Sequence, residues 1–412
     1  MKWKKMNLQL FADAHEQLQN TTGSSGMSAE MKTFYERRLI DQALPALVHD
    51  QFGDSYPIPA NNGKTIEFRK YDALPKATTP LTEGVTPEGQ ALTVTTVTAE
   101  VHQYGGWVPL TDMVQMTTID NNVVQATSVL ASQSGRTMDT IVRDILCGGT
   151  NVIYAPKIGT GGAETPVTSR AGLDATAQLT VDLIDQAVAQ LKVQNADPIG
   201  SAGGSYVAII HPYAAYDIKK DPNWVEAHKY ASPEEIFEGE IGKIEGCRFV
   251  ESTEAKIFHA ADLAGDSRTL LTAGAVSGKT TFPFDGGTVQ AGALVGRQVL
   301  IGNACVTVTA NTASSMTVDA AVTAEDNAII YPGEAGAQGR DVYVTLVLGA
   351  DGYGTTEITG GGLEHIVKQL GSAGTGDPLN QRASVGWKAT KVAVRLDDSA
   401  IRRIETCSTY TE

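Results

Sequence analysis

The string that could most readily do chemistry is AGAVSGKT, at residues 273–280, which fits a loose phosphate-loop pattern with alanine in place of the first glycine. Such a loop binds phosphate when a buried strand precedes it and a helix follows, because backbone N–H groups and the helix N-terminus then hold the anion. The continuation, TFPFDGGTVQAG, contains Pro283 and two adjacent glycines and does not favour a helix. We therefore interpret Lys279 as an exposed turn residue. A nucleotide hydrolase using Gly278, Lys279 and Thr280 is kept as an alternative.

Other catalytic and metal-binding patterns are missing from the sequence. It contains no G-x-S-x-G and no G-x-G-x-x-G. None of its histidines has a Cys, His or carboxylate at the spacing of metal ligands; they are at positions 15, 49, 102, 211, 228, 259 and 365. His211, before Pro212, is interpreted as a cap or packing residue. The cysteines at 147, 247, 305 and 407 form no C-x-x-C pair and are interpreted as buried thiols in a reducing compartment. We therefore predict no catalytic residue, no cofactor and no metal.

The composition is that of a globular chain. Its 412 residues are 42% apolar and 19% charged, which suffices for a large core and two or three domains. The net charge of −15 is spread without a basic stripe, which argues against sequence-specific nucleic-acid binding. No apolar run approaches the length of a membrane span. The start, MKWKKMNLQLFADA, imitates a signal peptide, but Asn7 and Gln9 interrupt its apolar core, so we expect no export.

A long amphipathic helix is predicted to end at Cys147, with Asp120 as its cap and Gly148-Gly149 as its stop. Apolar residues recur every three or four positions and predict one buried face: Ile119, Val123, Ala126, Leu130, Met138, Ile141 and Ile145. Polar residues mark the opposite face: Gln125, Ser132, Arg136, Asp139, Arg143 and Asp144. This helix is expected to be the element on which the rest of the fold is arranged.

The segments before this helix indicate an arm and a hairpin. Ser28 is expected to cap a helix that reaches residue 44, with Met31, Phe34, Tyr35, Leu39 and Ala43 along one side. Residues 45–63 contain three prolines and no period, and predict an extended arm that a neighbouring subunit would order. Strand signals then flank the long polar stretch LPKATTPLTEGVTPEGQ, and a phase slip predicts a bulge near Thr95-Thr96. Such a two-stranded arm is too thin to be stable alone.

Segments after the long helix alternate between helix and strand signals and predict a compact α/β unit. They are the strand NVIYA, the helix Leu179–Val193, the strand SYVAIIHP, the short helix Ala214–Lys219, the capping box Ser232-Pro233-Glu234-Glu235, and the strands CRFVES and DVYVTLVLG. Between about 265 and 338 the composition shifts, and RQVLIG, CVTVTA, SMTVDA and AIIYP read as short strands of a small all-β insertion.

The end of the chain is expected to return to the earlier sheets. Glu364–Leu370 is predicted as a short helix. WKATKVAVRL is predicted as a strand with Thr390, Val392, Val394 and Leu396 on one face. Trp107 and Trp387 are predicted to be core anchors.

The order of these segments resembles the major capsid proteins of tailed bacteriophages, with the Hong-Kong-97-type fold. The strings that carry the resemblance are PIPANNGKTIEFRKYDALPKATTPLTEGVTPEGQ, QYGGWVPLTD, GSYVAIIHPYAAYDIKKDPNW and GWKATKVAVRL, together with the N-terminal arm and its helix. They cover most of the chain outside about 265–338. The family supplies no universal ligand-binding residues, and the resemblance gives no basis for a crosslinking role of Lys64, Lys70 or Lys76.

The resemblance implies an α+β capsid fold with discontinuous domains. They are an N-terminal arm at 1–60, an extended β-hairpin loop at 61–106, a peripheral domain with the spine helix at 107–174 and 371–412, an axial α/β domain at 175–264 and 339–370, and the small β-rich insertion at 265–338.

The implied function is structural and not enzymatic. A major capsid protein would assemble with itself, as pentamers and hexamers, into an icosahedral shell around phage double-stranded DNA, after synthesis in the host bacterial cytoplasm. Head-to-tail contacts between arms and neighbours can close such shells. A portal and a separate scaffolding protein are expected partners, the latter because only about 27 residues precede the first predicted helix. The nucleotide hydrolase and a β-rich tail or appendage protein stay as alternatives.

Overall fold

The computed structural model describes residues 48–410, apart from 72–73, 82, 87–88, 119–121, 229–241, 261–262, 264–268, 303 and 373–376. The helix expected up to residue 44 and the capping box expected at 232–235 therefore lie outside the described residues. The chain forms two compact units. One contains His102–Gly135 and Ile358–Lys391, and the other contains Pro45–Val101, Arg136–Glu357 and Val392–Glu412.

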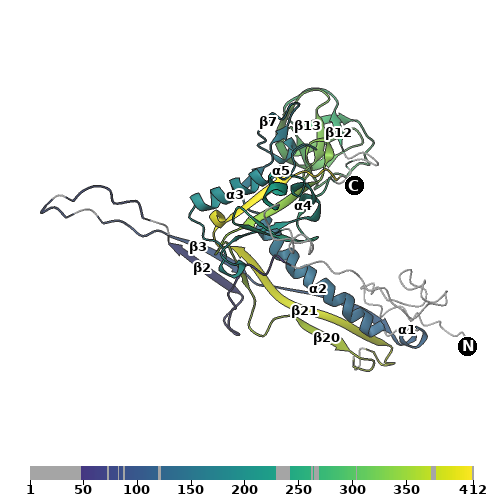
Figure 1. The fold of residues 1–412 in the computed structure, drawn as a ribbon. Helices are drawn as coiled ribbons and strands as arrows, with labels where there is room; N and C mark the ends of the chain where they lie inside the picture. The colour runs from purple at the N-terminus through teal and green to yellow at the C-terminus, as the bar shows by residue number, and fades with distance from the viewer. Residues whose placement is uncertain are drawn as a thin grey trace, which may run out of the picture. The chain divides into compact units, whose positions relative to one another are not determined.

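The first unit is built on an antiparallel sheet. The strands β4 (His102–Thr111) and β20 (Glu364–Lys368) pair with the two edges of the long strand β21 (Arg382–Arg395). The short helix α1 (Asp112–Thr117) follows β4 at once, and the Thr111 hydroxyl caps it by accepting from the Val114 backbone N–H at 3.3 Å. The spine helix α2 (Asn122–Cys147) runs beside β21 (Figure 1). It is joined to the sheet where Trp387 Nε1 donates to Gln133 Oε1 at 3.1 Å.

Two predictions for this sheet are wrong. Glu364–Leu370 was expected to be helical, but Glu364–Lys368 forms β20, because each of its residues pairs with β21, from Lys388 to Ser384. Trp107 was expected in the core and is 58% exposed, whereas Trp387 is buried as predicted. Trp107 lies opposite Gly386 in the register, and side chains alternate between the two faces of a strand, so it points to the face away from Trp387.

The predicted strand WKATKVAVRL is part of β21 up to Arg395, and the two faces of this strand differ in burial. Its most buried side chains are those at odd positions: Ala383, Val385, Trp387, Ala389 and Ala393. The predicted stripe of Thr390, Val392, Val394 and Leu396 is only half-buried. Because the side-chain period of a strand is two, the predicted stripe shares one face of the strand, and the opposite face is the more buried one.

The spine helix exists over nearly the predicted length, but its buried face is shifted. The buried residues are Leu130, Ser134, Asp139, Val142, Leu146 and Cys147. Ile145, expected inward, is 38% exposed, and Asp139, expected outward, is 2% exposed. The expected stripe left out Val142 and Leu146, which are buried, and the helix also buries Asp139, where it meets His49.

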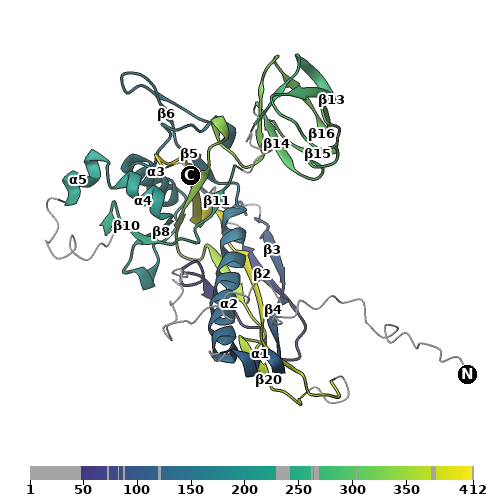
Figure 2. The ribbon, with the colours of Figure 1, turned by 90° about the vertical axis from the view of Figure 1, so that its right-hand side faces the viewer.

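The second unit contains a mixed seven-stranded sheet in the order β5-β22-β18-β8-β10-β9, with β11 on the edge of β18. Its strands are β5 (Val152–Tyr154), β22 (Ile401–Thr406), β18 (Val342–Leu348), β8 (Tyr206–Ile210), β10 (Cys247–Glu251), β9 (Lys243–Ile244) and β11 (Ile257–Phe258). The helix α3 (Val181–Val193) buries Leu183, Ile184, Ala187, Val188 and Leu191, as predicted. Two shorter helices, α4 (Pro212–Ile218) and α5 (Pro222–His228), follow β8 (Figure 2).

The same unit holds shorter pairings. The strand β19 (Tyr353–Thr356) pairs in parallel with β1 (Asp54–Ser55) and antiparallel with the last residues of β21. The two-residue strands β6 (Lys157–Ile158) and β7 (Glu164–Thr165) form a small antiparallel ribbon. None of the helices in the described part of the chain is long and apolar enough to cross a membrane.

A closed six-stranded barrel fills the region expected to be an all-β insertion. Around the barrel the strands are β12 (Leu270–Thr272), β13 (Val276–Asp285), β16 (Ser315–Ala324), β15 (Ala304–Asn311), β14 (Gln298–Ile301) and β17 (Ile329–Pro332) (Figure 2). Its own apolar cluster includes Leu270, Phe282, Leu294, Met316 and Ile330. The four strands predicted here are therefore confirmed.

Several expected boundaries fall elsewhere. His102–Gly106, expected in the hairpin, belongs to β4. Residues 401–406, expected in the peripheral domain, form a strand inside the seven-stranded sheet, because β22 pairs with both β18 and β5. Residues 364–368, expected in the axial domain, pair with β21 in the first unit. Local sequence patterns could not reveal these pairings, because a strand's partner is not given by its own sequence.

Candidate functional site

The hairpin of the second unit is the first candidate surface. Its strands β2 (Thr65–Tyr71) and β3 (Val94–Glu100) pair in continuous register, from Thr65 opposite Glu100 to Tyr71 opposite Val94. The bulge predicted near Thr95-Thr96 is therefore absent from this ladder. The phase slip arose because Leu92 and Val94 are exposed apolar residues and not members of an inward face.

Charged groups hold the base of the hairpin. Lys70 Nζ donates to Asp397 Oδ2 at 2.5 Å, and Lys64 forms an ion pair with Glu100 across the ribbon. Burial alone would raise the pKa of Asp397, but hydrogen bonds from Lys70 and Ser399 outweigh it and hold that pKa below its usual value. Ion pairs this exposed contribute little stability, so they orient the ribbon more than they strengthen it.

The tip of the hairpin presents apolar side chains to solvent. Exposed apolar residues in and beside the tip are Tyr71, Leu74, Leu81, Val85 and Leu92, and Leu81 is 77% exposed. Figure 1 shows the tip running on beyond β2 and β3. A two-stranded ribbon is at best marginally stable by itself, and exposed apolar groups of this kind mark interaction surfaces. The hairpin is thus suited to lie against a partner.

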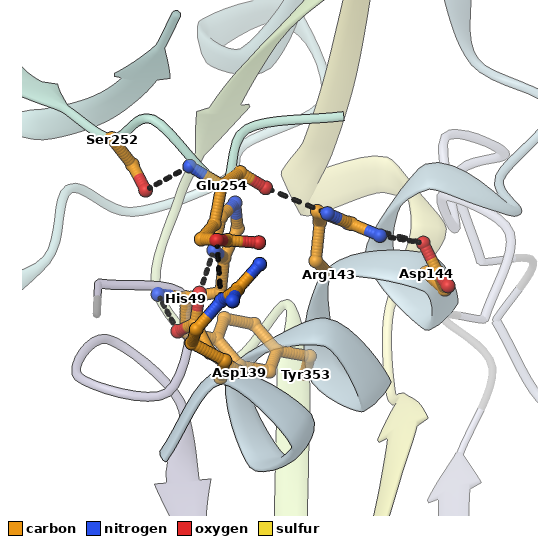
Figure 3. A network of polar contacts seen from close by, with 8 residues as sticks. His49, Asp139, Arg143, Asp144, Ser252, Glu254 and Tyr353 are labelled. Atoms are coloured by element: carbon orange, nitrogen blue, oxygen red, sulfur yellow. Dashed lines mark hydrogen bonds and ion pairs between the residues drawn. The ribbon is translucent and has the colours of Figure 1, made fainter. Parts of the chain in front are cut away.

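A buried polar junction joins His49, near the start of the described chain, to Asp139 and Tyr353 (Figure 3). Asp139 accepts two hydrogen bonds from His49, from the backbone N–H at 2.8 Å and from ring Nδ1 at 2.7 Å. The Tyr353 hydroxyl donates to the His49 carbonyl oxygen at 2.5 Å. All three residues are buried, and burial raises the pKa of Tyr353 well above its usual value. The junction therefore fixes the start of the described chain on α2.

The sequence analysis missed this junction. Residues 45–63 were expected to form an arm that gains little from order within one subunit and that a neighbouring subunit could order, yet Val48, His49 and Ile58 are buried within this chain. The available signal was the tripeptide Val48-His49-Asp50 at the end of an apolar run, together with a carboxylate inside a strongly periodic helix. A carboxylate is seldom buried without a partner, but the sequence does not say which residue provides it.

A second set of contacts joins α2 to the turn after β10. Arg143 Nη1 donates to the Glu254 carbonyl oxygen at 2.8 Å, and Arg136 Nε donates to Glu254 Oε1 at 2.8 Å (Figure 3). Arg143 also forms an ion pair with Asp144 at 3.0 Å. The Glu254 backbone N–H donates to Ser252 Oγ at 3.2 Å. The polar face predicted for α2 at Arg136 and Arg143 therefore contacts the turn after β10.

The phosphate-loop string forms part of a strand. Val276–Asp285 is one strand, β13, in which Lys279 pairs with Val322 of β16, with irregular register on either side. Lys279 is exposed, as predicted, but it is not in a turn. Gly278 has a φ of 59°, which marks one of these irregularities. The strand–loop–helix geometry that cradles phosphate is thus missing at Gly278, Lys279 and Thr280.

The remaining reactive side chains have structural positions. His211 caps α4, with its Nδ1 accepting from the Tyr213 backbone N–H at 3.2 Å, as predicted. Burial raises the pKa of Cys147, Cys247 and Cys407 to about 12, so these thiols stay protonated. Cys305 was expected to be buried and is exposed on β15. Within the described residues, no group of three or more His, Cys, Asp and Glu side chains is placed to hold a metal.

A family model described as "Phage capsid protein" matches residues 108–319, just over half of the chain. The chain belongs to the phage capsid protein family. The matched region begins within β4 and includes the spine helix, α3, β8 and most of the barrel. Among curated proteins, none matches the chain.

Solved capsid structures share the fold of this capsid protein at low sequence identity. The capsid of Cyanophage P-SCSP1u is 14% identical, with a TM-score of 0.53, over 94% of this chain and 96% of that one. The capsid of Cyanophage Pam1 is 11% identical, with a TM-score of 0.54, over 93% and 98%. The acid-stable capsid of Helicobacter pylori bacteriophage KHP30 is 12% identical, with a TM-score of 0.51, over 94% and 99%. At these identities the likeness shows the fold.

The fold is therefore the Hong-Kong-97-type capsid fold, and the predicted α+β class is confirmed. Membership of the phage capsid family gives the chain a structural role, as a major capsid protein of the virion. The predicted family and structural function are thus confirmed, and nothing supports the nucleotide hydrolase or the tail protein.

Proposed function

We propose that this capsid protein assembles with itself, as pentamers and hexamers, into an icosahedral shell that encloses phage double-stranded DNA. The observation that carries the proposal is the exposed tip of the β2–β3 hairpin. A ribbon that buries so little in its own subunit gains stability when its apolar side chains are covered by the next subunit. Many such weak contacts hold a particle together through multivalency.

The domain division belongs to the same proposal. Residues 1–60 act as the N-terminal arm and the hairpin as the extended loop, here ending at Val101 where β4 begins. The first unit, with the start of the spine helix, is the core of the peripheral domain. The seven-stranded sheet with α3 and α4 is the axial domain, and the barrel is an insertion with its own apolar cluster.

The other partners rest on the family and on charge. A net charge of −15 with no basic stripe suits a container that touches DNA weakly, because strong phosphate binding needs clustered lysines and arginines. A portal and a separate scaffolding protein are proposed from the family resemblance alone. The same holds for synthesis in the host cytoplasm and for the absence of any enzymatic activity.

Electron microscopy of the expressed chain tests the proposal. The chain, alone and co-expressed with candidate scaffolding genes from the same phage, should yield closed shells or rings in negative stain. Sedimentation of the same samples should show large, uniform particles. Soluble, folded protein that stays monomeric under every one of these conditions would contradict self-assembly.

A further inference from the structure

The first unit has an incompletely filled apolar groove. It has a volume of about 370 Å³ and lies among the start of α2, the end of β20 and the start of β21. Its apolar lining residues are Val123, Val367, Leu370, Ala383 and Val385. Val367 and Leu370 are exposed, although Val367 pairs with the buried Val385. The side chains of Val367 and Leu370 therefore line a groove beside α2 and stay partly exposed to solvent.

An apolar segment of the same chain has the composition to close it. Residues 28–44 lie outside the described part of the chain, and their sequence predicts a helix with an apolar stripe of Met31, Phe34, Tyr35, Leu39 and Ala43. An amphipathic helix of this length is marginal in water unless its apolar side is covered. We propose that residues 28–44 pack as a helix along α2 of their own subunit and fill this groove.

The point at which the chain enters the described structure limits where the segment can go. His49 is fixed to Asp139 on α2, and Val48 beside it is buried. Residue 44 can lie at most about 14 Å from Val48, because an extended chain spans at most ~3.6 Å per residue. The last turn of the expected helix must therefore lie near Asp139 of the same subunit.

The length of the expected helix matches the distance that it must cover. Val123 and Asp139 belong to one continuous helix, and a rise of 1.5 Å per residue places them ~24 Å apart. A helix over residues 28–44 is ~25 Å long. If it runs alongside α2 and parallel to it, with its C-terminal end at the His49 anchor, its first turn reaches Val123 and the groove. The tether also gives this segment a high effective concentration over any second copy.

Disulfide crosslinking of the unassembled subunit tests this placement independently of shell formation. In a Cys305→Ser background, which removes the exposed cysteine, Met31→Cys should crosslink to Val367→Cys within one chain. The matched control pairs Ala43→Cys with Val367→Cys. Position 43 lies ~18 Å further along the expected helix, so this pair should not crosslink. A crosslink in both pairs, in neither, or only between two chains overturns the proposal.

Hydrogen exchange supplies a second readout that needs no cysteine. Phe34→Ser with Leu39→Ser removes the apolar stripe, and the amides of α2 from Val123 to Leu130 should then exchange about ten-fold faster or more. Glu30→Ser with Arg37→Ser changes the polar side of the expected helix, keeps the net charge, and should leave exchange unchanged. Equal exchange in both double variants overturns the proposal.

Discussion

Asp139 of the spine helix accepts both the backbone N–H and the ring Nδ1–H of His49, at 2.8 and 2.7 Å, in a site that water does not reach. The two residues are 90 positions apart in sequence. Because Tyr353 holds the His49 carbonyl oxygen as well, three separate segments meet on one residue. The described part of the chain thus starts at a fixed point, His49.

Replacing Asp139 should destabilise the subunit strongly. Asp139→Ala leaves the His49 amide and ring buried without their acceptor, and a lost charged hydrogen bond with an unsatisfied donor costs about 2–4 kcal/mol. Asp144→Ala, which removes only the partly exposed ion pairs with Arg143 and Lys256, should cost about 0.5 kcal/mol or less. Urea unfolding of the unassembled subunit measures both. Equal losses for the two variants would show that the junction has no special role.

The buried face of the spine helix can be tested with one pair of variants. Val142 is fully buried, and burying a valine contributes roughly 1.5–3 kcal/mol, so Val142→Asp should give insoluble or unfolded protein. Ile145→Asp, on the exposed side, should yield folded protein with a circular dichroism spectrum like that of the unmodified chain. The reverse pattern would restore the face expected from the sequence.

The shifted helix face shows where prediction from sequence reached its limit. Local periods sufficed for α3, for β8 and for the barrel strands, because their buried side chains pack against other apolar side chains. Periodicity could not reveal that Asp139 is buried, since its partner His49 is far away in sequence. The same holds for β20, where pairing with β21 outweighs a segment that resembles a short helix.

Two carboxyl groups beside β1 predict a stability change with pH. Burial, then the hydrogen bond and the charge of Asp351, raise the pKa of Asp54. At neutral pH the ionised pair therefore destabilises the fold, and this penalty disappears as pH falls below the raised pKa and the pair takes up a proton. Asp351→Asn keeps the left-handed backbone, which asparagine tolerates, and removes the repulsion.

Melting temperatures at two pH values measure this effect. The Asp351→Asn subunit should melt above the unmodified chain at about pH 7 and level with it at about pH 3, where the raised pKa leaves the Asp54 carboxyl largely protonated and removes the repulsion. Glu357→Gln serves as a control that removes one negative charge elsewhere in the same unit. A gain that is the same at both pH values would mean that repulsion between the two carboxyl groups is not its cause.

Shortening the hairpin tip separates folding from assembly. Replacing residues 77–89 with Asn-Gly, a dipeptide that suits a two-residue hairpin turn, removes Leu81 and Val85 but keeps the paired strands and the Lys70–Asp397 contact. These side chains are exposed, so the isolated subunit should keep its melting temperature to within a few degrees. The shortened protein should sediment as monomers or small oligomers under conditions in which the unmodified chain forms shells.

A matched control keeps the tip at full length and changes its chemistry. Thr78→Ser with Thr79→Ser keeps Leu81 and Val85, and it should assemble normally, whereas Leu81→Ser with Val85→Ser should assemble as poorly as the shortened chain. The double serine variant removes apolar contact without altering length, so its failure would assign the loss to apolar burial between subunits. Normal shells from both the shortened chain and Leu81→Ser with Val85→Ser would show that the tip does not hold subunits together.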